Sequence, residues 1–260
     1  MKKILAIALM AAVSFTGCKD ENDTNNDNNN NDNNNPVLGN IEIHMDHVWG
    51  MMQSSFALDS EIVHPMSDDT MTFSTFKYYV SNVKLIEDDG TIWEHPESYF
   101  LVDLSATDGN VLSIGDVPAG NYTEFQYTLG VDSARNVSGA QTGALSVANG
   151  MFWSWNTGYI MIKAEGTSPQ LDGGMFKYHL GGFSGENNVV AEKSVDLTGN
   201  EVVVGDGTTS EIHLIANPAK LFHTYGSVTN GAMIMMPGAN ATTMANDFTG
   251  GVAFGSVVNE

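Results

Sequence analysis

His47 and Trp49 stand one residue apart, and this pair offers a candidate metal-binding arrangement. In an extended strand, side chains at positions i and i+2 lie on the same face, so the imidazole and the indole would be neighbours. Imidazole is a common ligand for copper, zinc and iron. A histidine on an apolar face can instead be a packing residue whose ring N–H is hydrogen-bonded. The residues alone leave both interpretations of His47 open.

The alternation around this pair predicts a strand over residues 41–49. Its odd-numbered positions are apolar apart from His47, whereas Glu42, His44 and Asp46 are polar. Because the side chains of a strand alternate between its two faces, His47 is expected on the inner face. His44 is expected on the solvent side, among acids.

Motifs of common enzyme classes are absent from the sequence. It lacks a Gly-x-Gly-x-x-Gly strand–helix unit, a P-loop, a His-Glu-x-x-His segment and a Gly-x-Ser-x-Gly elbow. Cys18 is the only cysteine, which excludes a disulfide within one chain and a cysteine-based zinc site. We therefore expect a protein that is not an enzyme.

Other residues with metal-binding side chains have no distinctive spacing. Four histidines are interpreted as structural or surface residues: His64, His95, His213 and His223. Asp103, Asp132 and Asn136 offer the oxygen ligands that Ca²⁺ prefers, although Asp and Asn in turns more often cap backbone N–H groups. Calcium is thus a candidate cofactor without an assigned site.

The fourteen methionines raise the question of a thioether copper site. Met45 would share the face of His47, and Met51 and Met52 follow Trp49 closely. Thioethers suit Cu(I), but methionine is also a common core filler, and core packing is the preferred interpretation. Strand packing is likewise expected for Met233, Met235 and Met236.

Short alternating segments separated by turn signals dominate the rest of the chain. Strands are also expected at residues 76–86, 99–104, 122–131, 158–166, 176–180, 189–197, 201–204 and 211–216. No helical pattern alternates with them, which argues against a parallel βαβ sheet. The sequence predicts an all-β protein, an antiparallel β-sandwich. One or two short helices are expected, at 217–222, where Asn217 precedes Pro218, and at 238–248.

The first residues resemble the signal peptide of a bacterial lipoprotein. Lys2 and Lys3 precede a short apolar run, and Phe15-Thr16-Gly17-Cys18 resembles a lipobox. Acylation of Cys18 would anchor the protein to a membrane of the bacterial cell envelope. The outer membrane is the expected one, with the domain on its periplasmic or its external side. A secretory signal with an incidental cysteine is the alternative.

These features divide the chain into three parts. Residues 1–17 are the expected signal peptide, and residues 18–36 are the lipidated cysteine with a disordered tether rich in Asn and Asp. Residues 37–260 form the expected β-sandwich domain. The formal net charge of −21 makes nucleic acid an unsuitable partner and favours cations or cationic proteins.

Several runs are similar to one known family. They are Gly130-Val131-Asp132-Ser133 with Asn136, the run from Gly143 to Tyr159, Tyr178-His179 with Gly181-Gly182, the run from Tyr78 to Leu85, and Leu101-Val102-Asp103. In order and spacing they resemble the MbnP-like copper-binding domain, whose relatives include the MopE and CorA copper proteins of methane-oxidising bacteria. The resemblance covers roughly residues 40–255.

This resemblance implies that Cu(I) is held by two histidines and a kynurenine formed from tryptophan. His47 and Trp49 reproduce the family's His and Trp one residue apart, and His179 is the corresponding distant histidine. On a simple pleat, however, His179 falls on the face of Lys177 and not on the apolar face. The Gly181-Gly182 pair could bulge the strand and turn the histidine inward.

The resemblance also implies a partner and a role. The partner is a dihaem cytochrome c peroxidase of the MbnH/MauG type, which would oxidise the tryptophan. The role is copper acquisition or handling in the cell envelope. Two alternatives remain, a surface or adhesive domain without metal and a carbohydrate-binding sandwich with exposed Trp153 and Trp155. If these two rings are not exposed, they are expected to fill the core.

Overall fold

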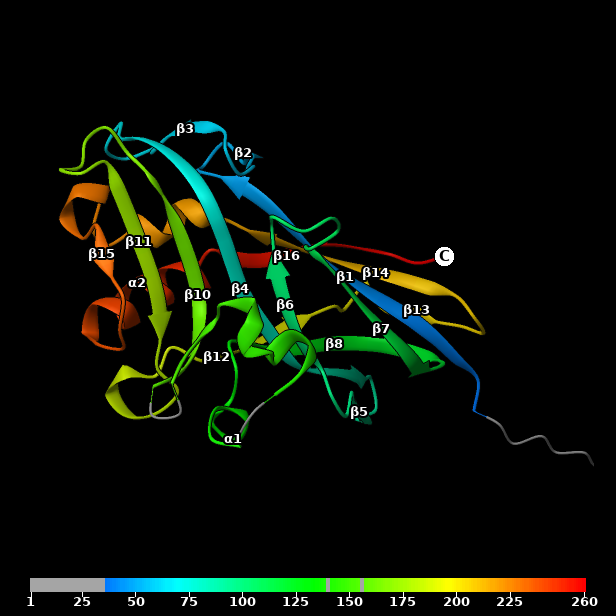
Figure 1. Cartoon of the computed structure of the whole chain (residues 1–260). Coiled ribbons are helices and arrows are strands. Elements are labelled where there is room, and N and C mark those ends of the chain that lie inside the picture. The colour runs from blue at the N-terminus through cyan, green and yellow to red at the C-terminus, as the bar shows by residue number, and fades with distance from the viewer. Residues whose placement is uncertain (1–35, 139–140, 155–156) are drawn as a thin grey trace, which may run out of the picture. The chain divides into compact units, whose positions relative to one another are not determined.

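Two β-sheets and few helices make up residues 36–138, 141–154 and 157–260, which the computed structural model describes (Figure 1). The first sheet contains β1 (Leu38–Trp49), β2 (Ser54–Ser55), β7 (Val111–Pro118), β14 (Thr209–Ala216) and β16 (Val252–Val258). Its strand order is β16–β14–β1–β2, and β7 also pairs with β1. The long strand β1 is therefore the centre of this sheet.

The second sheet is larger. Its strands are β3 (Glu61–Val63), β4 (Thr70–Glu87), β5 (Ile92–Glu94), β6 (Tyr99–Asp103), β8 (Gly120–Leu129), β9 (Phe152–Ser154), β10 (Gly158–Thr167), β11 (Met175–Gly181), β12 (Ala191–Asp196), β13 (Val202–Val204) and β15 (Met233–Ile234). The main order is β12–β8–β4–β10–β11–β15. The other strands add to β4, β8 and β10, so that β4 connects most of the sheet.

The predicted all-β sandwich is confirmed, with one difference in strand direction. Most neighbouring strands are antiparallel, but β1 pairs with β14 in parallel, and β11 pairs with β15 in parallel. Parallel neighbours need a long connection. The connection from β1 to β14 contains most of the second sheet, so β14 returns beside β1 in the same direction.

One hydrophobic core lies between the sheets. The expected alternation of β1 is confirmed, because Ile41, Ile43 and Met45 are fully buried. The helix α2 (Ala239–Thr249) also contributes to the core. The ring of its Phe248 lies 5.5 Å from that of Phe76 on β4, centroid to centroid.

Short helices occur near the two expected positions. The 3₁₀-helix η4 (Pro218–Phe222) begins after Asn217, whose side chain accepts a hydrogen bond from the Ala219 N–H. The helix α2 occupies the second position. The sequence did not predict α1 (Ser133–Asn136) or the 3₁₀ turns η1 (Gly143–Leu145), η2 (Val147–Asn149), η3 (Gly185–Asn187) and η5 (Val228–Asn230). In the described part of the chain, no helix has the length and apolar character needed to cross a bilayer.

Three predictions concern residues outside the described ranges. These are the signal peptide with Cys18, the Asn- and Asp-rich segment up to residue 35, and Trp155. They stay predictions.

Candidate metal centre

Two identical tripeptides lie side by side in the first sheet. They are Glu42-Ile43-His44 on β1 and Glu211-Ile212-His213 on β14. The parallel register pairs each residue of one tripeptide with its counterpart in the other. Ile43 and Ile212 are buried in the core, so the glutamates and histidines project from the opposite face of the sheet. The two strands therefore present two imidazoles and two carboxylates together.

The two rings and one carboxylate form a compact cluster. The imidazoles of His44 and His213 are stacked, with centroids 4.7 Å apart and an interplanar angle of 28°. Glu211 Oε2 lies 3.1 Å from His213 Nε2 and 3.9 Å from His44 Nε2. One ligand atom from each of the three residues lies within 4.8 Å of the others. Among the described residues, this is the only group of three or more His, Cys, Asp or Glu side chains that lies so close together.

These distances are compatible with a metal ion after small side-chain rotations. Nitrogen and oxygen ligands lie about 2.0–2.1 Å from a bound transition metal, so two ligands on opposite sides of it are roughly 4 Å apart. Two imidazole nitrogens and one carboxylate oxygen suit a divalent transition metal such as Cu(II). The side chains of His44 and His213 are 20% and 23% exposed, which leaves the cluster accessible from solvent.

Asp46 orients the ring of His213. Its Oδ2 lies 2.8 Å from His213 Nδ1, which leaves the other ring nitrogen facing Glu211. A carboxylate on the second nitrogen of a metal-binding histidine fixes the ring and is typical of such sites. Burial alone would lower the pKa of His213, but the carboxylates of Asp46 and Glu211 raise it above its usual value. A proton therefore competes with a metal at this ring in acid.

Glu42 lies at the outer edge of the cluster. Its Oε2 is 3.2 Å from His44 Nε2, and the hydroxyl of Ser113 donates to its Oε1 at 3.3 Å. Glu42 and Glu211 thus approach the same nitrogen of His44. A second carboxylate is therefore available to an ion held by the first three residues.

Sequence reasoning placed His44 correctly on the polar face but missed its partner. The sequence interpretation of His213 is a structural or surface residue; it does lie on the outer face of the sheet, but beside His44, because β14 lies next to β1. The repeat of Glu-Ile-His in two strand-like segments was the signal that could have identified the pair. Its use required the parallel alignment of two segments that are distant in the sequence.

His47 and Trp49 lie on the inner side of β1, and both polar groups have protein partners. His47 Nε2 lies 3.0 Å from the hydroxyl of Tyr78. Burial lowers the pKa of His47 to about 4. The indole N–H of Trp49 donates to the Val63 carbonyl at 2.7 Å, and the side chain is 5% exposed. His47 and Trp49 thus lie on the same face of β1, as the alternation predicted.

His179 lies on the other side of the second sheet, away from His47. Its neighbours Tyr178 and Leu180 fill the core, whereas His179 is opposite Lys163 on β10. Its Nε2 lies 2.6 Å from Glu165 Oε1. A register shift does occur beside Gly181, but it does not turn His179 inward. The structure therefore does not bring His179 together with His47 and Trp49.

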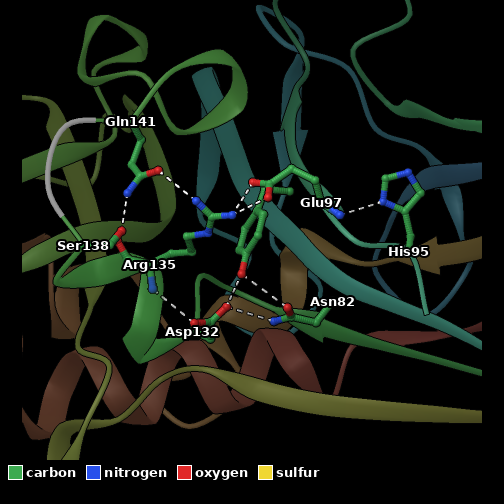
Figure 2. A network of polar contacts seen from close by, with 8 residues as sticks. Asn82, His95, Glu97, Asp132, Arg135, Ser138 and Gln141 are labelled. Atoms are coloured by element: carbon green, nitrogen blue, oxygen red, sulfur yellow. Dashed lines mark hydrogen bonds and ion pairs between the residues drawn. The ribbon is translucent and has the colours of Figure 1, made fainter. Parts of the chain in front are cut away.

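Asp132, one of the calcium candidates, is surrounded by protein donors (Figure 2). Its Oδ1 accepts hydrogen bonds from the backbone N–H groups of Ala134 and Arg135. Its Oδ2 accepts from the side chains of Asn82 and Tyr99. Burial would raise the pKa of Asp132, but these donors lower it below the usual value. The residue therefore acts as a structural cap.

The other calcium candidates also have structural partners. Asp103 Oδ2 forms an ion pair with Lys77 Nζ at 2.7 Å. The side chain of Asn136 donates to the Val131 carbonyl and accepts from the Tyr159 N–H. Calcium accordingly has no assigned site.

Trp153 is half-buried and packs against a glycine. A Cβ atom added to Gly181 would lie only 2.5 Å from Trp153 Cζ3, so glycine is needed for this contact. The ring is partly buried against the hydrophobic core. This packing agrees with a structural role for Trp153 and does not favour an open carbohydrate-binding surface.

Comparison with known proteins identifies one family. A family model described as MbnP matches residues 38–237. No curated protein matches the chain. Among solved structures, the chain is similar to MbnP from Methylosinus trichosporium, with 16% sequence identity and a TM-score of 0.52. This match covers 79% of the chain and 87% of that protein, and at this identity it supports a shared fold.

Proposed function

The chain belongs to the MbnP family, and on this premise we propose that it binds copper in the bacterial cell envelope. The observation that carries the proposal is the cluster of His44, Glu211 and His213. His44 and His213 would supply imidazole nitrogens, Glu211 a carboxylate oxygen, and Asp46 would hold the ring of His213. The role is binding and handling of the metal, without catalysis.

The chemistry of the cluster favours copper among the divalent metals. A given set of nitrogen and oxygen ligands generally binds Cu(II) more tightly than the other divalent first-row metals. The formal net charge of −21 raises the local concentration of cations. The parallel strands hold the two imidazoles in place before the metal arrives, which reduces the ordering cost of binding.

Copper binding to the purified full chain tests the proposal, measured by competition with a chromophoric chelator. His44→Gln/His213→Gln should lose tight Cu(II) binding, because two of the three ligands are removed. His95→Gln is the matched control, since His95 lies outside the cluster, and it should bind as the unmodified protein does. Unchanged Cu(II) affinity in the double variant would refute this site.

The second candidate site comprises His47, Trp49 and His179, and it is supported by the family resemblance. Here Cu(I) would be bound, and a dihaem cytochrome c peroxidase of the MbnH/MauG type would oxidise Trp49 to kynurenine. The placement of His47 and Trp49 on one side of β1 favours it. The position of His179 on the other face of the second sheet argues against this site.

One pair of variants distinguishes the two candidates. Loss of Cu(I) binding in His47→Ala/His179→Ala, with binding retained in His44→Gln/His213→Gln, would select the second site. Peptide mapping after co-expression with the cognate peroxidase detects kynurenine at Trp49 directly. Metal analysis of the protein from its native host tests the two alternatives to a copper protein. An adhesive domain or a carbohydrate-binding domain without a metal would contain no copper.

A further inference from the structure

A pocket of about 400 Å³ lies where β1 and β14 end side by side. It is lined by the loop after Trp49, by residues around Pro65, and by η4 and the residue that follows it. Asn217 joins two of these parts, because its side chain accepts from the Gly50 N–H at 3.1 Å and donates to the Gly50 carbonyl at 3.0 Å. The loop after β1 is thus fixed against η4.

Two exposed methionines line this pocket. Met51 is 91% exposed and Met66 is 61% exposed, so the interpretation of Met51 as core filling is wrong. Burial normally stabilises an apolar side chain, and an exposed methionine does not gain this stabilisation. Their flexible thioethers are free to reorient towards a ligand in the pocket. Met52 is 92% exposed, so the interpretation of Met52 as core filling is wrong as well. It does not line the pocket, which makes it a natural control.

Two histidines also line the pocket, and they differ in availability. His64 is buried, its Nδ1 lies 3.0 Å from the Ser67 hydroxyl, and it also has a backbone hydrogen bond with Ala219. His223 is exposed, and its ring has no hydrogen-bond partner among the described residues. His64 therefore forms part of the pocket wall without being free to bind an ion, whereas the ring of His223 is available as a ligand.

From this arrangement we infer a soft-metal site formed by Met51, Met66 and His223. Two thioethers with one imidazole select a soft monovalent ion such as Cu(I) over harder cations. Lys220 lines the same pocket, and its positive charge disfavours a divalent ion more than a monovalent one. The site differs in residues and chemistry from the cluster of His44, Glu211 and His213, and it does not depend on that cluster.

Silver titration of the full chain tests this site, since Ag(I) is a redox-inert soft ion. The His44→Gln/His213→Gln protein is the background, so that the first cluster cannot contribute. Adding Met51→Leu/Met66→Leu should weaken Ag(I) binding by roughly tenfold or more. Loss of a residue that only holds a metal ligand in place already costs about that much, and these two residues would be ligands themselves. Leucine has a similar volume, so the fold should be preserved. Adding Met52→Leu should leave the affinity unchanged.

Oxidation by hydrogen peroxide gives a second measurement. Bound Ag(I) should protect Met51 and Met66 from conversion to the sulfoxide, whereas Met52 should be oxidised at the same rate with and without silver. Equal affinities for the Met51→Leu/Met66→Leu and Met52→Leu proteins, or equal oxidation of all three methionines, would overturn the inference. Failure of the first cluster would appear instead as unchanged Cu(II) binding in the background protein.

Discussion

Histidines on the two faces of the first sheet have pKa values that are shifted in opposite directions. His47 faces the interior, where burial penalises the charged ring and lowers its pKa to about 4. His213 faces outwards, where the carboxylates of Asp46 and Glu211 outweigh burial and raise its pKa. The neutral ring of His47 can either accept a hydrogen bond from the Tyr78 hydroxyl or donate one to it. At His213, a proton and a metal ion would compete for the same ring.

The pKa of His47 predicts a loss of stability in acid. The folded protein binds the proton less readily than the unfolded chain, whose histidine pKa is about 6.5. The stability that the neutral His47 contributes is therefore fully present above pH 6.5 and is lost as the pH falls towards 4. The free energy of unfolding should decrease by up to roughly 3 kcal/mol for this reason. Urea unfolding at several pH values, with a chelator present, should show a shallower decline for His47→Gln than for the unmodified protein. His95→Gln is the control, and parallel declines in all three proteins would contradict the prediction.

At the scale of elements, the family-like run around Asp132 builds a junction and not a metal site. Asp132 caps α1 and binds Asn82 on β4 and Tyr99 on β6. Asn82 has a positive φ of 53°, a conformation that Asn tolerates better than most residues. Arg135 lies over the Tyr99 ring, 5.2 Å from its centroid. One carboxylate therefore connects a short helix to two strands.

Removal of this carboxylate should destabilise the junction. Asp132→Ala should cost about 2 kcal/mol or more, because the helix loses its cap and partly buried donors lose their acceptor. Asp89→Ala is the control, since Asp89 accepts from the Thr91 N–H in an exposed turn and its loss should cost less. Guanidinium unfolding measures both. Equal effects would indicate that Asp132 does not connect these elements.

Patterns within one element were predictable, whereas contacts between distant elements were not. The alternation of residues 41–49 placed His44 and His47 on their correct faces, and the pleat alone placed His179 away from the core. The pairing of His44 with His213 depends on the parallel alignment of β1 with β14, which local alternation does not encode. The pocket of Met51, Met66 and His223 likewise requires three distant segments to meet.

At the scale of the whole molecule, the sequence predicts that the folded part is held at a membrane by Cys18. The run Phe15-Thr16-Gly17-Cys18 follows a short apolar segment, as in lipoprotein signals. Cys18→Ser removes the thiol that would be acylated, so the protein should move from the membrane fraction to the soluble fraction. Ser14→Ala, which leaves the four-residue run intact, should stay with the membranes. Intact mass of the membrane-bound protein should show lipid on Cys18. A Cys18→Ser protein that remains in the membrane fraction would instead mean that something other than this cysteine holds it there.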